Sequence, residues 1–318
     1  MEVISSAADM RRWSRAHRAA GRRVAFVPTM GFLHEGHLSL VREARARADV
    51  VAVSIYVNPA QFAAHEDFGT YPRDDEGDLA KLRAVGADAA FVPAHLYAQD
   101  APTPSPPPPP HETFVTVERL STGLCSTTRP HFFRGVATVV CKLFNVVEPD
   151  VAVFGKKDYQ QFRVVQRMVR DLDYDIRIVG VELTREPDGL AMSSRNVRLD
   201  PEARVAARAI SKALAGLKRD FDREGEEGGG GGGGGGAARE DRFRIDLADP
   251  EATRRRVVDA VEASGGEVDY VEVVDQLTLR PVERLVRGES SAVVLVAAKY
   301  GGVRLLDNVE LGPEAKAG

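Results

Sequence analysis

Cysteine is scarce in this 318-residue chain, in which Cys125 and Cys141 are the only two. Two thiols cannot build a disulfide framework, and they fit a reducing compartment. Long hydrophobic runs are also missing, since no apolar stretch approaches the roughly 18 residues that a membrane span requires. The Arg- and Ala-rich N-terminal stretch has no apolar core segment and carries Glu2 and Asp9, so it is predicted to be a helix of the fold rather than a targeting peptide. We therefore expect a cytoplasmic protein that does not enter a membrane.

An excess of positive charge is absent as well. Lys and Arg number 43 against 47 Asp and Glu, which gives a formal net charge of -4. Such a chain has no general attraction for nucleic acid or for anionic membranes, so neither is expected as a partner. An anionic ligand would have to be met by a local group of cations and N–H donors.

Hydrophobic periodicity indicates the fold class. Strand-like runs such as "RVAFVPT", "VVAVSIYV", "VAVFG" and "IRIVGVEL" alternate with helical patterns such as "HLSLVREARARA" and "DYQQFRVVQRMVRDL". This alternation predicts an α/β domain over residues 1–184, with a Rossmann-like parallel sheet and helices on both of its faces. After about Thr184 the pattern changes, and residues 185–318 are predicted to form a smaller α+β domain. Ligands of such sheets bind at the carboxyl ends of the strands.

Two segments of biased composition interrupt these patterns. Residues 101–112 form a proline-rich stretch, and residues 225–238 contain a tract of nine glycines. Neither composition can pack a core, and we expect both to be solvated loops. A ligand for a proline-binding module remains an alternative for the first segment.

The stretch "PTMGFLHEGH" follows the first strand-like run and contains the first candidate site. Its histidines are three residues apart, which is not the spacing of a zinc-binding HExxH helix, and the sequence has no Cys or His cluster to supply further ligands. Buried structural histidines are the plain alternative. However, glycines let a ligand approach the main chain, and a helix that begins here directs free N–H groups at an anion. The candidate residues for binding a nucleotide are Met30, Gly31, His34, Gly36 and His37.

Two further loops carry cations and small residues. "VFGKKDYQQF" supplies Gly155, Lys156, Lys157 and Asp158 directly after a strand-like run, although lysines there could also form a solvated face. "GLAMSSRNVRL" supplies the segment 192–195, which consists of Met192, Ser193, Ser194 and Arg195 and by itself is equally typical of a turn. Together, the three loops favour a nucleoside triphosphate as ligand.

The segments "PTMGFLHEGH", "VNPAQF", "RPHFFRGV", "FGKKDYQQ" and "DGLAMSSRN" occur in an order and spacing that resembles the pantothenate synthetase (pantoate–β-alanine ligase) family. The resemblance covers roughly residues 24–308 and is interrupted by the two biased segments. It departs from the family at Lys156, where many members have glutamate.

The resemblance implies an activity: ATP-dependent condensation of pantoate with β-alanine to pantothenate, AMP and pyrophosphate through a pantoyl-adenylate. It implies ATP as substrate, Mg²⁺ held mainly by the phosphates, and a homodimer. The implied catalytic residues are His37 as proton donor, His34, Lys157 and Arg195. Gln61 and Gln161 match the pantoate-binding glutamines of the family, and Asp78 is a weaker candidate for a Mg²⁺ ligand. All the loop residues named above are implied to contact ATP.

Two other functions stay open at this point. Another nucleotidyltransferase with the "HxGH" feature would share the histidine loop and lack the two glutamine motifs. A non-catalytic ATP-binding scaffold would keep the loops and turn nothing over.

Overall fold

The computed structural model describes residues 1–63, 66–97, 111–223, 249–286 and 288–315. Nearly all of the proline-rich stretch and the whole glycine-rich insertion lie outside these residues. The chain divides into two compact units, and each is described by itself. The first unit consists of Met1–Thr184 and Met192–Ser194, and the second consists of Arg185–Ala191 and Arg195–Gly318.

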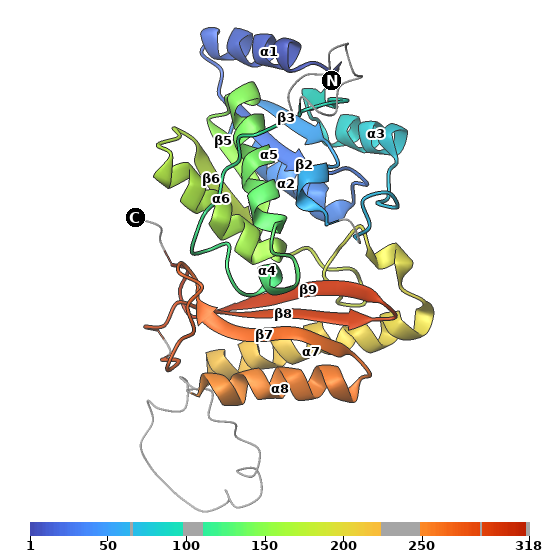
Figure 1. Cartoon of the computed structure of the whole chain (residues 1–318), viewed down its shortest axis with the longest axis vertical. Helices are drawn as coiled ribbons and strands as arrows, with labels where there is room; N and C mark the ends of the chain where they lie inside the picture. The colour runs from blue at the N-terminus through green and yellow to red at the C-terminus, as the bar shows by residue number, and fades with distance from the viewer. Residues whose placement is uncertain (64–65, 98–110, 224–248, 287, 316–318) are drawn as a thin grey trace, which may run out of the picture. The chain divides into compact units, whose positions relative to one another are not determined.

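The first unit is built on a parallel sheet of six strands in the order β1-β4-β3-β2-β5-β6 (Figure 1). Most residues of the central strands are Val, Ala, Ile or Phe, as expected of strands covered on both faces. The strands are β1 (Glu2–Ile4), β2 (Val24–Thr29), β3 (Val50–Ile55), β4 (Ala89–Phe91), β5 (Val151–Gly155) and β6 (Arg177–Val181).

Helices cover both faces of this sheet. Ala25 and Val27 of β2 share a buried core cluster with Val41 of α2, whereas the intervening Phe26 meets the Phe144 ring of α5 edge-on, with 6.5 Å between centroids. Alternate residues of one strand thus pack against different helices. The helices of the unit are α1 (Ala7–Ala19), α2 (Glu35–Arg45), α3 (Asp75–Val85), α4 (Cys125–Thr128), α5 (Phe132–Val147) and α6 (Tyr159–Asp171). The predicted Rossmann-like arrangement is confirmed.

Strand β2 lies between β3 and β5, and the direction in which the chain fills the sheet changes between β2 and β5. Because all the strands are parallel, the loops that leave β2, β3 and β5 emerge at the same edge of the sheet. This is the topological switch point at which open α/β sheets bind ligands.

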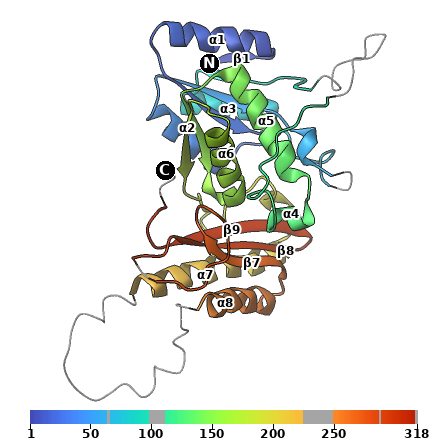
Figure 2. The ribbon, with the colours of Figure 1, turned by 60° about the vertical axis from the view of Figure 1, so that its left-hand side comes forward.

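The second unit contains an antiparallel sheet in the order β7-β8-β9. Helices α7 and α8 pack on it (Figure 2). Leu214 of α7, Val257 of α8 and Val294 of β8 belong to one core cluster. The elements are α7 (Pro201–Arg223), α8 (Pro250–Ala263), β7 (Glu267–Asp275), β8 (Ala292–Tyr300) and β9 (Val303–Leu311). This confirms the predicted smaller α+β part. Among the described residues of the chain, no helix combines the length and apolarity of a membrane span.

Candidate active site

The loop between β2 and α2 is shaped by two left-handed residues in succession, Gly31 with φ of 84° and Phe32 with φ of 51°. A Cβ at residue 31 would lie 3.0 Å from both Ile55 Cγ2 and Asp78 Oδ2, so that position requires glycine on two counts. The Thr29 hydroxyl donates to the Ser54 carbonyl at 2.7 Å and ties the start of the loop to β3. The local sequence therefore determines a bent, tightly held loop.

A histidine pair stands where this loop enters α2. His34 is the N-cap residue of α2, and its backbone N–H donates to Nδ1 of His37 at 3.3 Å. The two rings lie 4.1 Å apart between centroids. A Cβ on Gly36 would come within 2.9 Å of the His34 ring, so the missing side chain leaves room for that imidazole. The pair thus sits at the N-terminal, positive dipole end of an 11-residue helix.

His37 is neutral in the absence of ligand. Burial, together with the smaller effects of the nearby His34 and Lys157, lowers its pKa to about 3. Because Nδ1 accepts the backbone hydrogen bond, the single proton of the neutral ring is on Nε2. His37 therefore offers one N–H donor, and incoming negative charge would favour its protonation.

The loop after β3 holds the carboxamide of Gln61, which is 8% exposed. Its Oε1 accepts from Asn58 Nδ2 at 2.9 Å, and its Nε2 donates to Met30 Sδ at 3.2 Å. The turn η1 (Pro59–Gln61) packs so closely on α5 that a Cβ at Gly135 would meet the Ala60 carbonyl oxygen at 2.2 Å. The contact with Met30 joins this loop to the histidine loop.

Arg129 supports the same loop from the segment before α5. Its Nη2 donates to the Gln61 carbonyl at 3.1 Å, while Nε and Nη2 form a bidentate pair with Glu66 at 2.8 and 2.6 Å. Sequence reasoning singled out neither Asn58 nor Arg129 as a functional residue. Both belong to quoted segments, "VNPAQF" and "RPHFFRGV", and their position in those motifs was the available signal.

Lys156 and Lys157, at the end of β5, lie in different environments. The Lys156 side chain is only 5% exposed and pairs with Glu182 at 2.7 Å, whereas Lys157 Nζ lies 3.0 Å from Asp158 Oδ2. Lys157 and Asp158 both act on the pKa of His37, which places them near the histidine pair. Gln161 is half-buried on the first turn of α6. Its neighbour Gln160 is buried and bonds to the chain around α4, for example to the backbone N–H of Cys125 at 3.1 Å.

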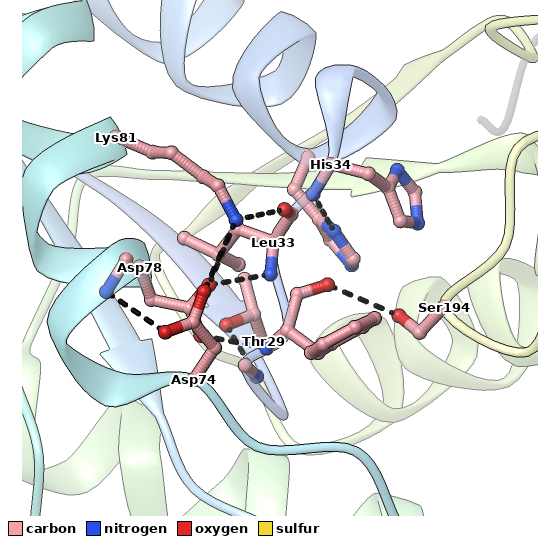
Figure 3. Close-up of polar contacts among 11 residues, drawn as sticks. Thr29, Leu33, His34, Asp74, Asp78, Lys81 and Ser194 are labelled. Atoms are coloured by element: carbon pink, nitrogen blue, oxygen red, sulfur yellow. Dashed lines mark hydrogen bonds and ion pairs between the residues drawn. The ribbon is translucent and has the colours of Figure 1, made fainter. Parts of the chain in front are cut away.

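The segment Met192–Ser194 belongs to the first unit, although the residues on both sides belong to the second. The Met192 N–H donates to the Thr184 carbonyl at 3.0 Å. Ser194 Oγ donates to the Phe32 carbonyl at 3.3 Å, so this serine lies on the histidine loop (Figure 3). Arg195, the next residue, is assigned to the second unit.

Asp78 is fully buried in α3, and its two oxygens accept from the backbone N–H groups of Phe32 and Leu33, both at 2.6 Å. Burial raises the pKa of this carboxyl, and the two backbone donors oppose that rise. No group of three or more His, Cys, Asp or Glu side chains suited to a metal occurs in the described parts of the chain.

A parallel sheet with a histidine pair at a helix N-terminus, a lysine and small residues at its switch point defines a Rossmann-like nucleotide-binding protein. Residues 2–310 match the profile of the family described as Pantoate-beta-alanine ligase, and the chain belongs to that family.

Individual relatives agree with this assignment over nearly their full length. The chain is 48% identical to the Pantoate--beta-alanine ligase of Arabidopsis thaliana, with 98% of each chain covered. It superposes on the pantothenate synthetase of Thermus thermophilus with a TM-score of 0.81 at 38% identity, covering 98% of this chain and 100% of that one. A Francisella tularensis pantoate-beta-alanine ligase, solved in complex with "Beta-gamma ATP" and β-alanine, matches with a TM-score of 0.72 at 25% identity, covering 98% and 97%.

Proposed function

We propose that this protein condenses pantoate with β-alanine at the expense of ATP, which is cleaved to AMP and pyrophosphate. The observation that carries the proposal is the Gln61–Met30 contact of 3.2 Å, which joins a carboxamide suited to an organic acid to the loop of the histidine pair. Family membership supports it, because the relatives named above carry this activity in their names.

The first half-reaction is the attack of a pantoate carboxylate oxygen on the α-phosphorus of ATP. A P–O bond to that carboxylate forms, the bond to the bridging oxygen of the β-phosphate breaks, and pyrophosphate leaves with the electron pair. His34, His37 and Lys157 are the donors proposed to meet the charge that develops on the phosphates. His37 contributes its Nε2–H and, once the anion has raised its pKa, a full proton. Mg²⁺, bound chiefly by the phosphates, would supply further charge neutralisation.

Other groups of the first unit form the walls of the nucleotide site in this proposal. Close main-chain approach is proposed at the glycines, hydrogen bonding at the serines, and further contacts at the β5 end. The residues assigned to ATP are Met30, Gly31, Gly36, Gly155, Lys156, Asp158, Met192, Ser193 and Ser194. Lys156 is paired with Glu182, so we expect it to stabilise the end of β5 as well as to attract phosphate.

Gln61 and Gln161 are proposed to bind pantoate. A carboxamide donates to the carboxylate without adding charge, and the Gln61 Nε2 is the group that faces away from Asn58. In the second half-reaction the β-alanine amine attacks the acyl carbon, AMP leaves, and the amine loses a proton. The Francisella relative was solved in complex with both an ATP ligand and β-alanine, which supports binding of both substrates by the present protein.

The second unit is proposed to act as a lid domain that brings Arg195 to the triphosphate and excludes water from the adenylate. A cytoplasmic homodimer is proposed from the family resemblance alone. Light scattering at micromolar concentrations tests the dimer directly, and a monomer throughout would contradict it.

Isotope exchange tests the proposed function. Labelled pyrophosphate should enter ATP when pantoate and Mg²⁺ are present and β-alanine is absent, because the adenylate forms reversibly. Lys157→Ala should abolish the exchange even at saturating pantoate, whereas Gln161→Ala should mainly raise the pantoate concentration required. Exchange that needs β-alanine, or products ADP and phosphate, would rule the mechanism out. A nucleotidyltransferase for another acceptor would show no dependence on pantoate, and a binding scaffold would show no turnover.

A further inference from the structure

We propose that Asp78 is a positioning residue for the histidine loop, and that Asp78 and Lys81 of α3 together hold the backbone conformation that places His34 and His37 at the start of α2. The inference rests on the proposed function in that it assigns the loop to ATP. Its evidence is the set of contacts between α3 and the loop shown in Figure 3.

The carboxylate of Asp78 is committed to the loop. It is 0% exposed, and its Oδ2 and Oδ1 accept from the successive N–H groups of Phe32 and Leu33, each at 2.6 Å. Charge-assisted hydrogen bonds of this kind are about twice as strong as neutral ones. The two left-handed residues, Gly31 and Phe32, turn the chain so that both N–H groups face one carboxylate.

Lys81 binds the backbone carbonyl of Leu33, the residue whose N–H is bound by Asp78. Its Nζ donates to the Leu33 carbonyl at 2.9 Å and lies 3.7 Å from Asp78 Oδ1. One turn of α3 therefore holds both the N–H and the C=O of Leu33. A water-exposed loop would need no such double attachment, whereas a loop that must keep two imidazoles in place gains from it.

The support itself is anchored in the fold. Asp74 caps α3 by accepting the Gly77 N–H at 3.1 Å, and Leu82, one residue after Lys81, is fully buried in the core cluster of β2 and α2. The helix turn that carries Asp78 is consequently fixed from both ends. Displacement of Leu33 would be passed on directly, because the next residue is the N-cap His34, whose N–H bonds to the ring of His37.

The competing role for Asp78 is that of a Mg²⁺ ligand. Both roles predict that its substitution harms activity, but they differ in the response to metal. A lost metal ligand weakens the apparent affinity for Mg²⁺, and excess Mg²⁺ restores the rate. A lost loop support misplaces the histidines, and no concentration of Mg²⁺ restores them.

The experiment uses Asp78→Asn, Lys81→Met and, as matched control, Asp75→Asn, which changes an exposed carboxylate of the same helix. Asp78→Asn turns one acceptor into an NH₂ group that faces a backbone N–H. Lys81→Met keeps the aliphatic stem and removes only the ammonium. Steady-state rates are measured over a Mg²⁺ titration at saturating pantoate and β-alanine. The imidazole ¹H–¹⁵N signals of the free proteins are recorded in parallel, with His37 assigned through His37→Gln.

For Asp78→Asn we expect kcat to fall on the order of tenfold to a hundredfold, as for a misplaced catalytic group, with no recovery at high Mg²⁺ and with a shifted His37 signal. Lys81→Met should lower kcat by a smaller factor and also shift the His37 signal. Asp75→Asn should match the wild type in both. Recovery of Asp78→Asn by Mg²⁺ would overturn the proposal, as would wild-type histidine signals in that variant.

Two safeguards keep the test decisive. If Asp78→Asn does not fold, Lys81→Met decides, since unchanged kinetics and unchanged histidine signals in that variant would overturn the proposal. The histidine spectra need no substrate, so they test the positioning role even if the wild type fails to exchange pyrophosphate. That failure would remove the proposed function and leave the structural role of Asp78 to be judged by the spectra.

Discussion

Asn58 donates from Nδ2 to the Oε1 of Gln61 at 2.9 Å, and the orientation of Asn58 is itself imposed by the backbone. Its Oδ1 accepts from the Ala60 N–H at 3.4 Å and from the Tyr97 hydroxyl at 3.0 Å, while its Nδ2 also donates to the Gly135 carbonyl at 3.2 Å. A flipped Asn58 would oppose like groups at both backbone contacts. Gln61 is thereby held with its NH₂ group directed away from Asn58.

Asn58→Asp should therefore weaken pantoate binding. The new carboxylate oxygen would face Gln61 Oε1, and relief requires the Gln61 amide to turn and lose its donor orientation. We expect kcat/KM for pantoate to fall by about tenfold to a hundredfold, corresponding to about 1–3 kcal/mol for a buried group left unsatisfied. The KM for ATP serves as the internal control and should change little. A pantoate KM equal to that of the wild type would show that the amide orientation does not matter.

Gly36→Ala should separate activity from stability. The residue lies in the first turn of α2 with ordinary backbone angles, where alanine favours the helix by up to about 1 kcal/mol over glycine. Its Cβ would nevertheless meet the His34 ring at 2.9 Å and displace the imidazole. We expect pyrophosphate exchange to fall at least tenfold, on the scale of a misplaced catalytic group. Thermal unfolding should occur at the same or a higher temperature, and loss of both properties together would contradict the explanation.

His37 should make the protein less stable in acid. Its pKa in the folded protein is about 3, below the ordinary value of 6.5, so the unfolded chain binds a proton first as the pH falls. The contribution of His37 to the free energy of unfolding is complete above pH 6.5 and is lost as the pH falls toward 3, with a slope of at most about 1.4 kcal/mol per pH unit.

His37→Gln removes this titration. In urea unfolding at several pH values between 7 and 4, the free energy of unfolding of the wild type should fall relative to that of the variant as the pH decreases. If the two free energies of unfolding differ by the same amount at every pH in this range, His37 titrates alike in the folded and unfolded chain.

The second unit depends on an ion pair between its first residue and β9. Arg185 donates to both oxygens of Asp307 at 2.7 and 2.9 Å, and the Asp307 side chain is only 4% exposed. Arg185→Met should cost about 1–3 kcal/mol of local stability, because the buried Asp307 carboxylate loses both of its guanidinium hydrogen bonds. The double variant with Asp307→Leu should recover part of that loss.

Hydrogen exchange of the β9 amides measures the effect where it occurs. The only tryptophan, Trp13, belongs to the first unit, so tryptophan fluorescence would not report on β9. Equal protection of β9 in wild type and Arg185→Met would show that the pair contributes nothing.

Much of the fold followed from periodicity. The runs at β2, β3 and β5 are almost purely apolar because each strand is covered on both faces, and the intervening helices repeat apolar residues every three or four positions. Strand order could not be obtained in this way, since nothing local in β1 indicates that it pairs with β4 across the whole intervening chain. Such pairing is decided by packing of segments that are distant in sequence.

The candidate site was predictable where chemistry is local. The histidine loop, with its glycines and its helix start, is readable in ten residues. Asp78 shows the limit: an acidic residue in an acidic helix indicates a metal ligand as readily as a backbone support. Its bonds to Phe32 and Leu33 span 46 and 45 residues, respectively, and exist only in the folded chain. The Mg²⁺ role of Asp78 stays a prediction, and the Mg²⁺ titration described above decides it.

The assignment of Met192–Ser194 to the first unit has a consequence for the order in which the protein is made. When Thr184 leaves the ribosome, the parallel sheet is complete, yet the histidine loop still lacks the Ser194 hydroxyl that bonds to the Phe32 carbonyl. A fragment that ends at residue 184 would be expected to fold around its sheet with an unfinished nucleotide loop. Anyone dividing this enzyme for fragment complementation or for circular permutation must therefore carry the chain through Ser194, even though a stretch of the second unit is then included.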